Sequence, residues 1–144
     1  MSFDEVTGQT TAVETLQRAL ASGHVHHAYR FEGPDGVGKE LTAFALARAL
    51  VCVRRPGEGC GECSACVRAL TLSPEEPHVP QHPDVVLIER GLYPPAVLGR
   101  TSPETTGIGV EQIRRIVTSR AMYPPHEARH LVFIFRAEIG RAHV

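Results

Sequence analysis

The chain has 144 residues, of which 42% are hydrophobic and 22% charged, and its formal net charge is −1. This composition is typical of one globular domain that is large enough to bury a core. The sequence has no apolar run of eighteen residues and no signal-like N-terminus, which argues against membrane insertion or secretion and favours the cytosol. The near-neutral charge excludes a uniformly basic surface, so nucleic-acid contacts must come from a local patch or from partner subunits.

The N-terminal third is predicted to alternate between helix and strand. Apolar residues recur at helical spacing from Val13 to Leu20, which predicts an amphipathic helix over residues 10–21. A short strand is expected over 28–32, then a glycine-rich loop, and an alanine- and leucine-rich helix is expected over 41–51. Strand, glycine loop and helix in this order form the context in which a phosphate-binding loop works.

The glycine-rich loop, Gly33-Pro-Asp-Gly-Val-Gly-Lys39, matches the start of the P-loop pattern of nucleotide-binding proteins. Its lysine is the only one in the chain, and it stands where the pattern needs an ammonium group for the terminal phosphates. The pattern then requires a Ser or Thr hydroxyl for magnesium, but Glu40 stands at that position. The loop is therefore expected either to bind ATP without hydrolysing it or to serve only in packing. The candidate nucleotide-binding residues are Gly33, Asp35, Gly36, Val37, Gly38, Lys39 and Glu40.

Four cysteines follow the predicted P-loop helix within one short window. They are Cys52, Cys60, Cys63 and Cys66. Four thiolates at this spacing can surround one zinc ion tetrahedrally, and such a site is structural because no position is left for water. Two disulfides or four free thiols are the alternatives, and disulfides are disfavoured in a cytosolic chain. Arg54, Arg55 and Arg68 either offset the negative charge of a zinc–thiolate centre or are ordinary surface residues.

The second half is predicted to contain two more strands and one more helix. Residues 72–83 hold four prolines and are expected to form a loop, and a second loop is expected over 91–107. Continuous apolar runs predict buried parallel strands over 84–89 and 131–135, with a helix over 108–120 between them. The alternation predicts an α/β fold with a mostly parallel sheet that helices cover on both faces. The apolar face of the helix consists of Val110, Ile113, Ile116 and Val117.

The end of the last predicted strand lacks the acid that ATP hydrolysis needs. An acidic residue at the end of a strand near the P-loop positions the metal ion and its water. Here the strand ends at Phe135 and Arg136 follows, and the next acid is Glu138. No ATP hydrolysis is therefore expected from this chain.

Taken together, these motifs make the chain resemble the bacterial replicative clamp loaders, and among them the delta-prime subunits of DNA polymerase III. The resemblance runs from Phe3 to about Glu138 and implies an AAA+ (RecA-like P-loop) fold with a zinc module inserted after the P-loop helix. The segments that carry it are Val6-Thr-Gly8-Gln9, His27-Ala28-Tyr29 with the glycine loop, the four cysteines, His82-Pro83-Asp84, and Ile108-Gly-Val-Glu-Gln-Ile-Arg114.

The resemblance also implies a division of the chain. Residues 1–51 would be the N-terminal part of the AAA+ core, 52–70 the zinc module, and 71–138 the remainder of a partial core. Residues 139–144 leave the family pattern and resemble the translated read-through of a sequencing-library adapter, so a non-native tail is expected there. A divergent natural C-terminus is the alternative.

Three functions follow from these observations. The resemblance implies a non-catalytic stator subunit that acts with gamma/tau and delta subunits to load the sliding clamp on primed DNA. The gamma/tau pattern keeps a Thr after the P-loop lysine and an Asp-Glu pair at the strand end, and this chain departs from it at Glu40 and Arg136. The alternatives are an active ATPase subunit of the gamma/tau type and a zinc-stabilised module that binds nucleic acid directly.

Overall fold

Two helices at the N-terminal side match the sequence prediction. The structure, a computed structural model, describes residues 10–25, 28–29 and 39–136. Helix α1 spans Thr10–Ser22, and its apolar stripe is buried at Leu16 and Leu20. Helix α2 spans Lys39–Val51, so the predicted helix is confirmed and begins two residues earlier than expected.

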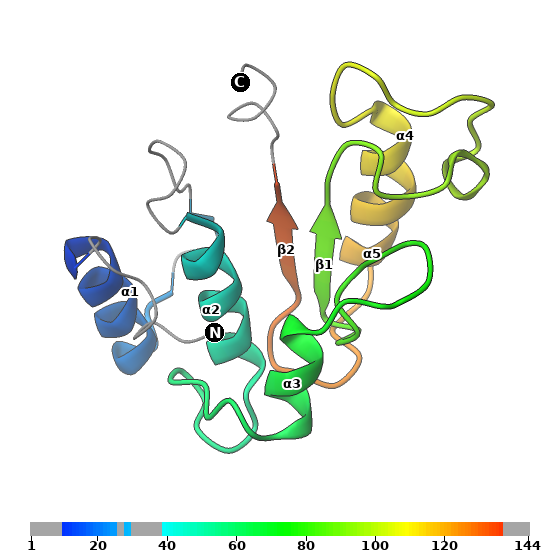
Figure 1. The fold of residues 1–144 in the computed structure, drawn as a ribbon. Coiled ribbons are helices and arrows are strands. Elements are labelled where there is room, and N and C mark those ends of the chain that lie inside the picture. Colours follow the sequence, from blue (N-terminus) through cyan, green and yellow to red (C-terminus); the bar gives the residue numbers. More distant parts are fainter. Residues whose placement is uncertain (1–9, 26–27, 30–38, 137–144) are drawn as a thin grey trace.

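Helix α2 is the centre of the described core. Alanine and leucine make it apolar on nearly every side, and it is buried along most of its length, which is typical of a helix covered by other elements. Ala45, Leu46 and Ala49 pack against α1, while Ala47 and Val51 pack against the rest of the domain. Figure 1 shows α2 standing between α1 and the two strands.

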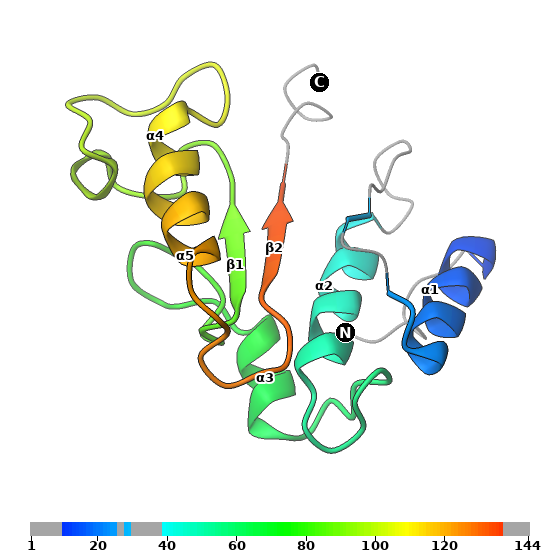
Figure 2. The same cartoon turned by 180° about the vertical axis from the view of Figure 1, so that it is seen from behind.

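The two described strands form a parallel sheet, as the sequence predicts. Strand β1 spans Val85–Ile88 and strand β2 spans Val132–Phe135, and they pair in register from Val85 with Val132 to Ile88 with Phe135. The strands lie between α2 and the helical segment that includes α4 and α5 in both views (Figures 1 and 2). Parallel pairing places the carboxyl ends of both strands at the same edge of the sheet.

The predicted strand over 28–32 and the glycine loop fall largely outside the described residues. Only Ala28 and Tyr29 of that strand are described, and neither lies in a strand. Of the candidate phosphate-loop residues, Lys39 and Glu40 are described. The predicted tail over 139–144 also lies outside the described part of the chain.

Two short helices lie in segments where none was predicted. Helix α3 (Ser64–Leu70) begins inside the cysteine segment, where the Cys63 sulfur caps it by accepting a hydrogen bond from the Cys66 N–H. A 3₁₀ helix, η2 (Pro95–Leu98), lies in the predicted second loop and buries Leu98. Seven residues are too few to show helical periodicity, which explains why no pattern predicted α3.

The predicted helix over 108–120 is confirmed, but part of its predicted apolar face is wrong. It consists of α4 (Val110–Gln112), π-helical residues Ile113–Thr118 and α5 (Ser119–Ala121). Val110 is 60% exposed, whereas Gln112 is fully buried. The polar side chain is buried because it bonds the backbone at the end of β1: its Nε2 donates to the Glu89 carbonyl at 3.0 Å and its Oε1 accepts from the Glu89 N–H at 3.1 Å.

Candidate metal centre and phosphate-loop end

The cysteine segment folds back on itself between α2 and α3. Cys52 directly follows α2 and Cys63 directly precedes α3, so the two helices, which pack on each other, fix the two ends of the segment. The chain between them turns at Gly57, Gly59 and Gly61, which have φ values of 88°, 80° and 79°. This left-handed region is open to glycine at little cost, so the glycines allow the tight path.

The four sulfurs form a compact cluster. All four Sγ atoms lie within 4.8 Å of one another, and the Cys52–Cys63 and Cys60–Cys66 sulfur pairs are each 3.9 Å apart. A tetrahedral zinc ion with bonds of about 2.3 Å would space its sulfur ligands by about 3.8 Å. A disulfide has a sulfur separation of about 2.05 Å. The cysteines are therefore free thiols in this structure, at the spacing of ligands around one tetrahedral ion.

Backbone N–H groups surround the sulfurs. The N–H groups of Arg55 and Cys60 donate to the Cys52 sulfur at 3.2 and 3.3 Å. Those of Glu62 and Cys63 donate to the Cys60 sulfur at 3.4 and 3.2 Å. Such bonds favour the thiolate over the thiol and orient the ligands, as is usual around a structural metal site.

Two cysteines of the cluster have pKa values that are shifted in opposite directions. Burial opposes ionisation of Cys63, but N–H groups of Val53 and Cys66 outweigh it and lower the pKa of Cys63 to about 6. Burial raises the pKa of Cys66 to about 12. Metal binding therefore requires the release of a proton from Cys66, since only the thiolate is a ligand.

The sequence left two interpretations of Arg54, Arg55 and Arg68: charge compensation at the centre, or ordinary surface residues. The Arg54 guanidinium lies 3.3 Å from the Glu62 carboxylate, and the Arg68 guanidinium pairs with Glu127. Arg55 contributes its backbone N–H to the cluster, as described above. Arg54 and Arg55 are exposed, as the surface alternative expects, whereas Arg68 is half-buried in its ion pair with Glu127.

A buried arginine that the sequence reasoning missed lies beneath the cysteine loop. Arg48 on α2 is 5% exposed, and a Cβ at Gly59 would lie only 3.0 Å from its Nε. A Cβ at Gly61 would lie 3.5 Å from its Nη1. The guanidinium thus packs against the glycine turns of the cysteine loop and supports them. One signal was available, since Arg48 is the only charged residue between Leu41 and Val51 in an otherwise apolar helix.

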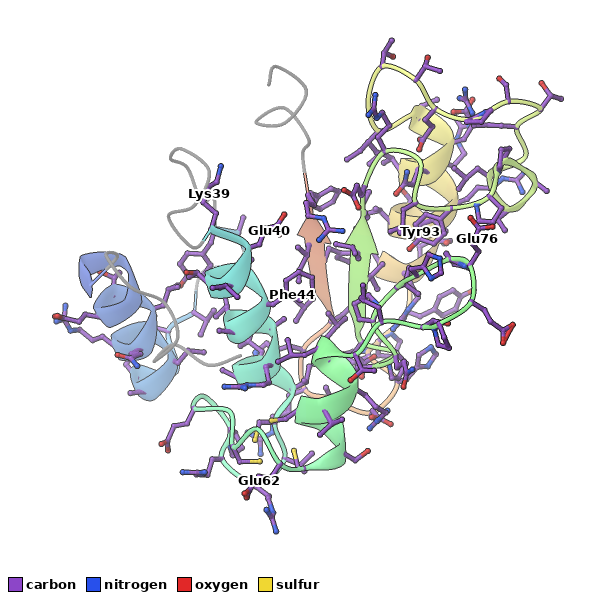
Figure 3. The ribbon with its side chains drawn as sticks, viewed as in Figure 1. Lys39, Glu40, Phe44, Glu62, Glu76 and Tyr93 are labelled. Atoms are coloured by element: carbon purple, nitrogen blue, oxygen red, sulfur yellow. The ribbon has the colours of Figure 1, made fainter. Side chains whose placement is uncertain are left out.

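The phosphate-loop end of α2 faces the carboxyl edge of the sheet. Figure 3 shows Glu40 pointing from the first turn of α2 toward β2, while Lys39 leaves the helix in another direction. The Arg136 guanidinium, directly after β2, lies 3.9 Å from the Glu40 carboxylate and 2.7 Å from the Glu89 carboxylate. The two residues that depart from the nucleotide-hydrolysing pattern are therefore in ion-pair contact with each other.

A third polar cluster lies at the opposite, amino edge of the sheet. The Asp84 carboxylate is fully buried and accepts from the N–H groups of His126, Glu127 and Ala128 at 2.6, 2.9 and 2.7 Å. Burial opposes ionisation, but these three bonds outweigh it, so the pKa of Asp84 is lowered. Arg120 adds a contact at 3.1 Å. Asp84, part of the His82-Pro83-Asp84 motif, therefore fixes the loop that leads into β2.

The comparisons with known proteins agree with this architecture. The model of a family described as "DNA polymerase III, delta subunit" matches residues 8–138, which is most of the chain. This match places the chain in the clamp-loader class of proteins. The chain is a member of the DNA polymerase III delta subunit family.

Curated relatives point to the same machinery. The chain is 35% identical over 134 residues to the DNA polymerase III subunit gamma/tau of Mycobacterium tuberculosis, covering 92% of this chain and 20% of that protein. It is 45% identical over 65 residues to subunit tau of Bacillus subtilis, covering 44% of this chain and 12% of the relative. Protein STICHEL-like 1 of Arabidopsis thaliana is 44% identical over 68 residues, covering 46% of this chain and 6% of the relative. The chain thus spans about a fifth or less of the length of these relatives.

The structure also bears on membrane association. Among the helices of the described residues, none is both long and apolar enough to span a bilayer.

Proposed function

We propose that this chain is part of a clamp-loader subunit that does not hydrolyse ATP. In this proposal it acts as a stator of the delta-prime type, in the cytoplasm, and holds gamma/tau and delta subunits while they load the sliding clamp on primed DNA. Membership of the DNA polymerase III delta subunit family supports a place for this chain in the clamp-loader assembly. The non-catalytic role rests on a separate observation at the end of the phosphate loop.

That observation is the pairing of Glu40 with Arg136. Hydrolysis of ATP on a P-loop requires a hydroxyl after the lysine and an acid at a strand end, because both hold the magnesium ion that neutralises the phosphates. Here the two positions carry a carboxylate and a guanidinium that contact each other at 3.9 Å. A guanidinium cannot be a metal ligand, so this pair supports a loop without catalytic magnesium.

In the same proposal the four cysteines hold one structural zinc ion. Cys52, Cys60, Cys63 and Cys66 offer four soft sulfur ligands at tetrahedral spacing, a set that favours zinc over calcium or magnesium. The ion would tie the end of α2 to the start of α3 and would take no part in chemistry. The candidate phosphate loop, from Gly33 to Lys39, is proposed to keep at most the ability to bind a nucleotide.

The test uses the full-length protein, alone and reconstituted with its partner subunits. Alone, we expect no ATP turnover with Mg²⁺, and in the assembly we expect it to raise the DNA- and clamp-dependent ATPase rate of its partners. The stator role is wrong if the isolated protein hydrolyses ATP and Lys39→Ala abolishes this activity. The Arg100→Gln variant, which breaks a partly buried ion pair with Glu111 at 3.0 Å, is the control.

One observation favours a second candidate function, an ATPase subunit of the gamma/tau type. The relatives that match most of this chain are gamma/tau subunits. The same measurement decides between the two, because a motor subunit turns over ATP and a stator does not. Arg136, which follows β2 where the gamma/tau pattern has an Asp-Glu pair, supports the stator over the ATPase subunit.

A further inference from the structure

Three charged side chains gather at the carboxyl edge of the sheet, and we call them the strand-end triad: Glu40, Glu89 and Arg136. Glu89 follows β1, Arg136 follows β2, and Glu40 lies in the first turn of α2. Arg136 is the central member, because its guanidinium contacts the Glu89 carboxylate at 2.7 Å and the Glu40 carboxylate at 3.9 Å. The triad thus joins three elements that are far apart in the sequence.

The backbone holds the triad in place. The Arg136 N–H donates to the Ile88 carbonyl at 2.9 Å, which continues the parallel pairing one residue beyond the strands. The backbone of Glu89 is bonded on both its N–H and its carbonyl by the buried Gln112 amide. The remaining Gln112 N–H bond goes to the Glu104 carboxylate at 2.8 Å. These hydrogen bonds therefore fix the backbones of Glu89 and Arg136, and the fixed backbones bring the two side chains together.

The magnesium ion that a P-loop implies does not fit these residues. Magnesium takes six oxygen ligands at about 2.1 Å and tolerates little distortion. Glu40 and Glu89 supply carboxylate oxygens, but a guanidinium already lies between them, and it is always charged. A divalent cation at this place would meet the repulsion of Arg136 and would have to break its ion pair with Glu89.

We propose that the Arg136 guanidinium is an internal replacement for the divalent cation of the phosphate loop. It neutralises the carboxylates of Glu40 and Glu89 and ties the start of α2 to the sheet, so the site keeps a positive charge without metal. The inference rests on the proposed non-catalytic function and gives it a mechanism: the protein excludes the metal. Removing the guanidinium leaves two carboxylates, which are hard oxygen ligands suited to Mg²⁺ or Mn²⁺.

The experiment measures Mn²⁺ binding to the zinc-loaded full-length protein by electron paramagnetic resonance, with and without ATP. We expect no specific Mn²⁺ site in the wild type and at least about a tenfold gain in Mn²⁺ affinity in Arg136→Gln. Arg136→Lys keeps the positive charge and is expected to behave as the wild type. Arg136→Met, with an apolar stem of similar length, provides the same comparison if the Gln variant does not fold.

A control variant separates the triad from a general loss of positive charge. Arg114 is an exposed residue of the π-helical segment and lies outside the strand-end triad, so Arg114→Gln should leave Mn²⁺ binding unchanged. Equal Mn²⁺ binding by the wild type and Arg136→Gln, whether strong or absent in both, would overturn the inference. If the inference alone fails, the wild type still does not hydrolyse ATP, whereas failure of the proposed function shows as ATP turnover.

Discussion

The two ends of the small parallel sheet differ in the polar groups that they hold. At the amino end, Asp84 is buried among three N–H donors, and the adjacent helix α3 and its N-cap residue Cys63 together hold two of the four clustered sulfurs. At the carboxyl end, two acids share one arginine next to the start of the phosphate-loop helix. The amino end lies beside four sulfurs at the spacing of metal ligands, and in the proposed function the carboxyl end holds no catalytic magnesium ion. In the proposed function, the amino end stabilises the fold and the carboxyl end takes no part in ATP hydrolysis.

The largest effect is expected at the cysteine centre. Cys66→Ser removes a buried ligand, and because the binding free energy of a structural metal contributes to folding, we expect the free energy of unfolding to fall by about 5 kcal/mol or more. The measurement is chemical denaturation of the full-length protein together with its zinc content. Val67→Ser, at a half-exposed position of the same helix, is the control and should change neither quantity much. A stable zinc-free Cys66→Ser protein would show that the cluster does not support the fold.

The next largest effect is expected at Asp84. Asp84→Asn replaces one acceptor oxygen by an amino group that faces N–H donors, so we expect a loss of about 2–4 kcal/mol in the free energy of unfolding at pH 7. Glu75→Gln, an exposed change of the same kind, is the control. Equal stability of the two variants in denaturant titrations would contradict the role given to the buried carboxylate.

Acid should weaken the amino end of the sheet in two steps. Burial and the nearby Arg68 lower the pKa of His82, and the N–H donors lower the pKa of Asp84. Both groups bind protons more weakly when folded, so each stabilises the fold above its unfolded pKa, about 6.5 for His and 3.9 for Asp. Each contribution is lost as the pH falls through the lower folded value. Unfolding titrations from pH 8 to pH 3 should show this decline, and a flatter decline in Asp84→Asn below pH 4.

The smallest effect compares two glycines with left-handed backbone. Gly59 has φ +80° and lies against Arg48, whereas Gly91 has φ +74° with no atom near its Cβ position. Substitution of Gly91 by Ala should lower the free energy of unfolding by about 1 kcal/mol, from backbone strain alone. At Gly59 the loss should be about 2 kcal/mol, because the new methyl group also meets the Arg48 guanidinium. Thermal unfolding measures the difference. A loss at Gly59 no larger than that at Gly91 would show that Arg48 moves aside freely.

The sequence predicted those features that depend on local pattern. The apolar runs over 84–89 and 131–135 gave both strands, and the cysteine spacing gave the cluster, because each signal lies within a few residues. It could not predict that Gln112 is buried or that Arg48 supports the cysteine loop. Each depends on a contact with another segment of the chain. Gln112 bonds Glu89, and Arg48 lies against Gly59. Arg136 was noted as a departure from the catalytic pattern, but its contact with Glu40 required the fold.

The most direct test of the central claim is the metal dependence of nucleotide binding. Calorimetric titration of the full-length protein with ATP, once with Mg²⁺ and once with EDTA, compares the two conditions on the same sample. We predict that Mg²⁺ does not tighten ATP binding, because Arg136 is proposed to neutralise Glu40 and Glu89 in place of the metal ion. A tenfold or greater gain in ATP affinity with Mg²⁺ would contradict the account.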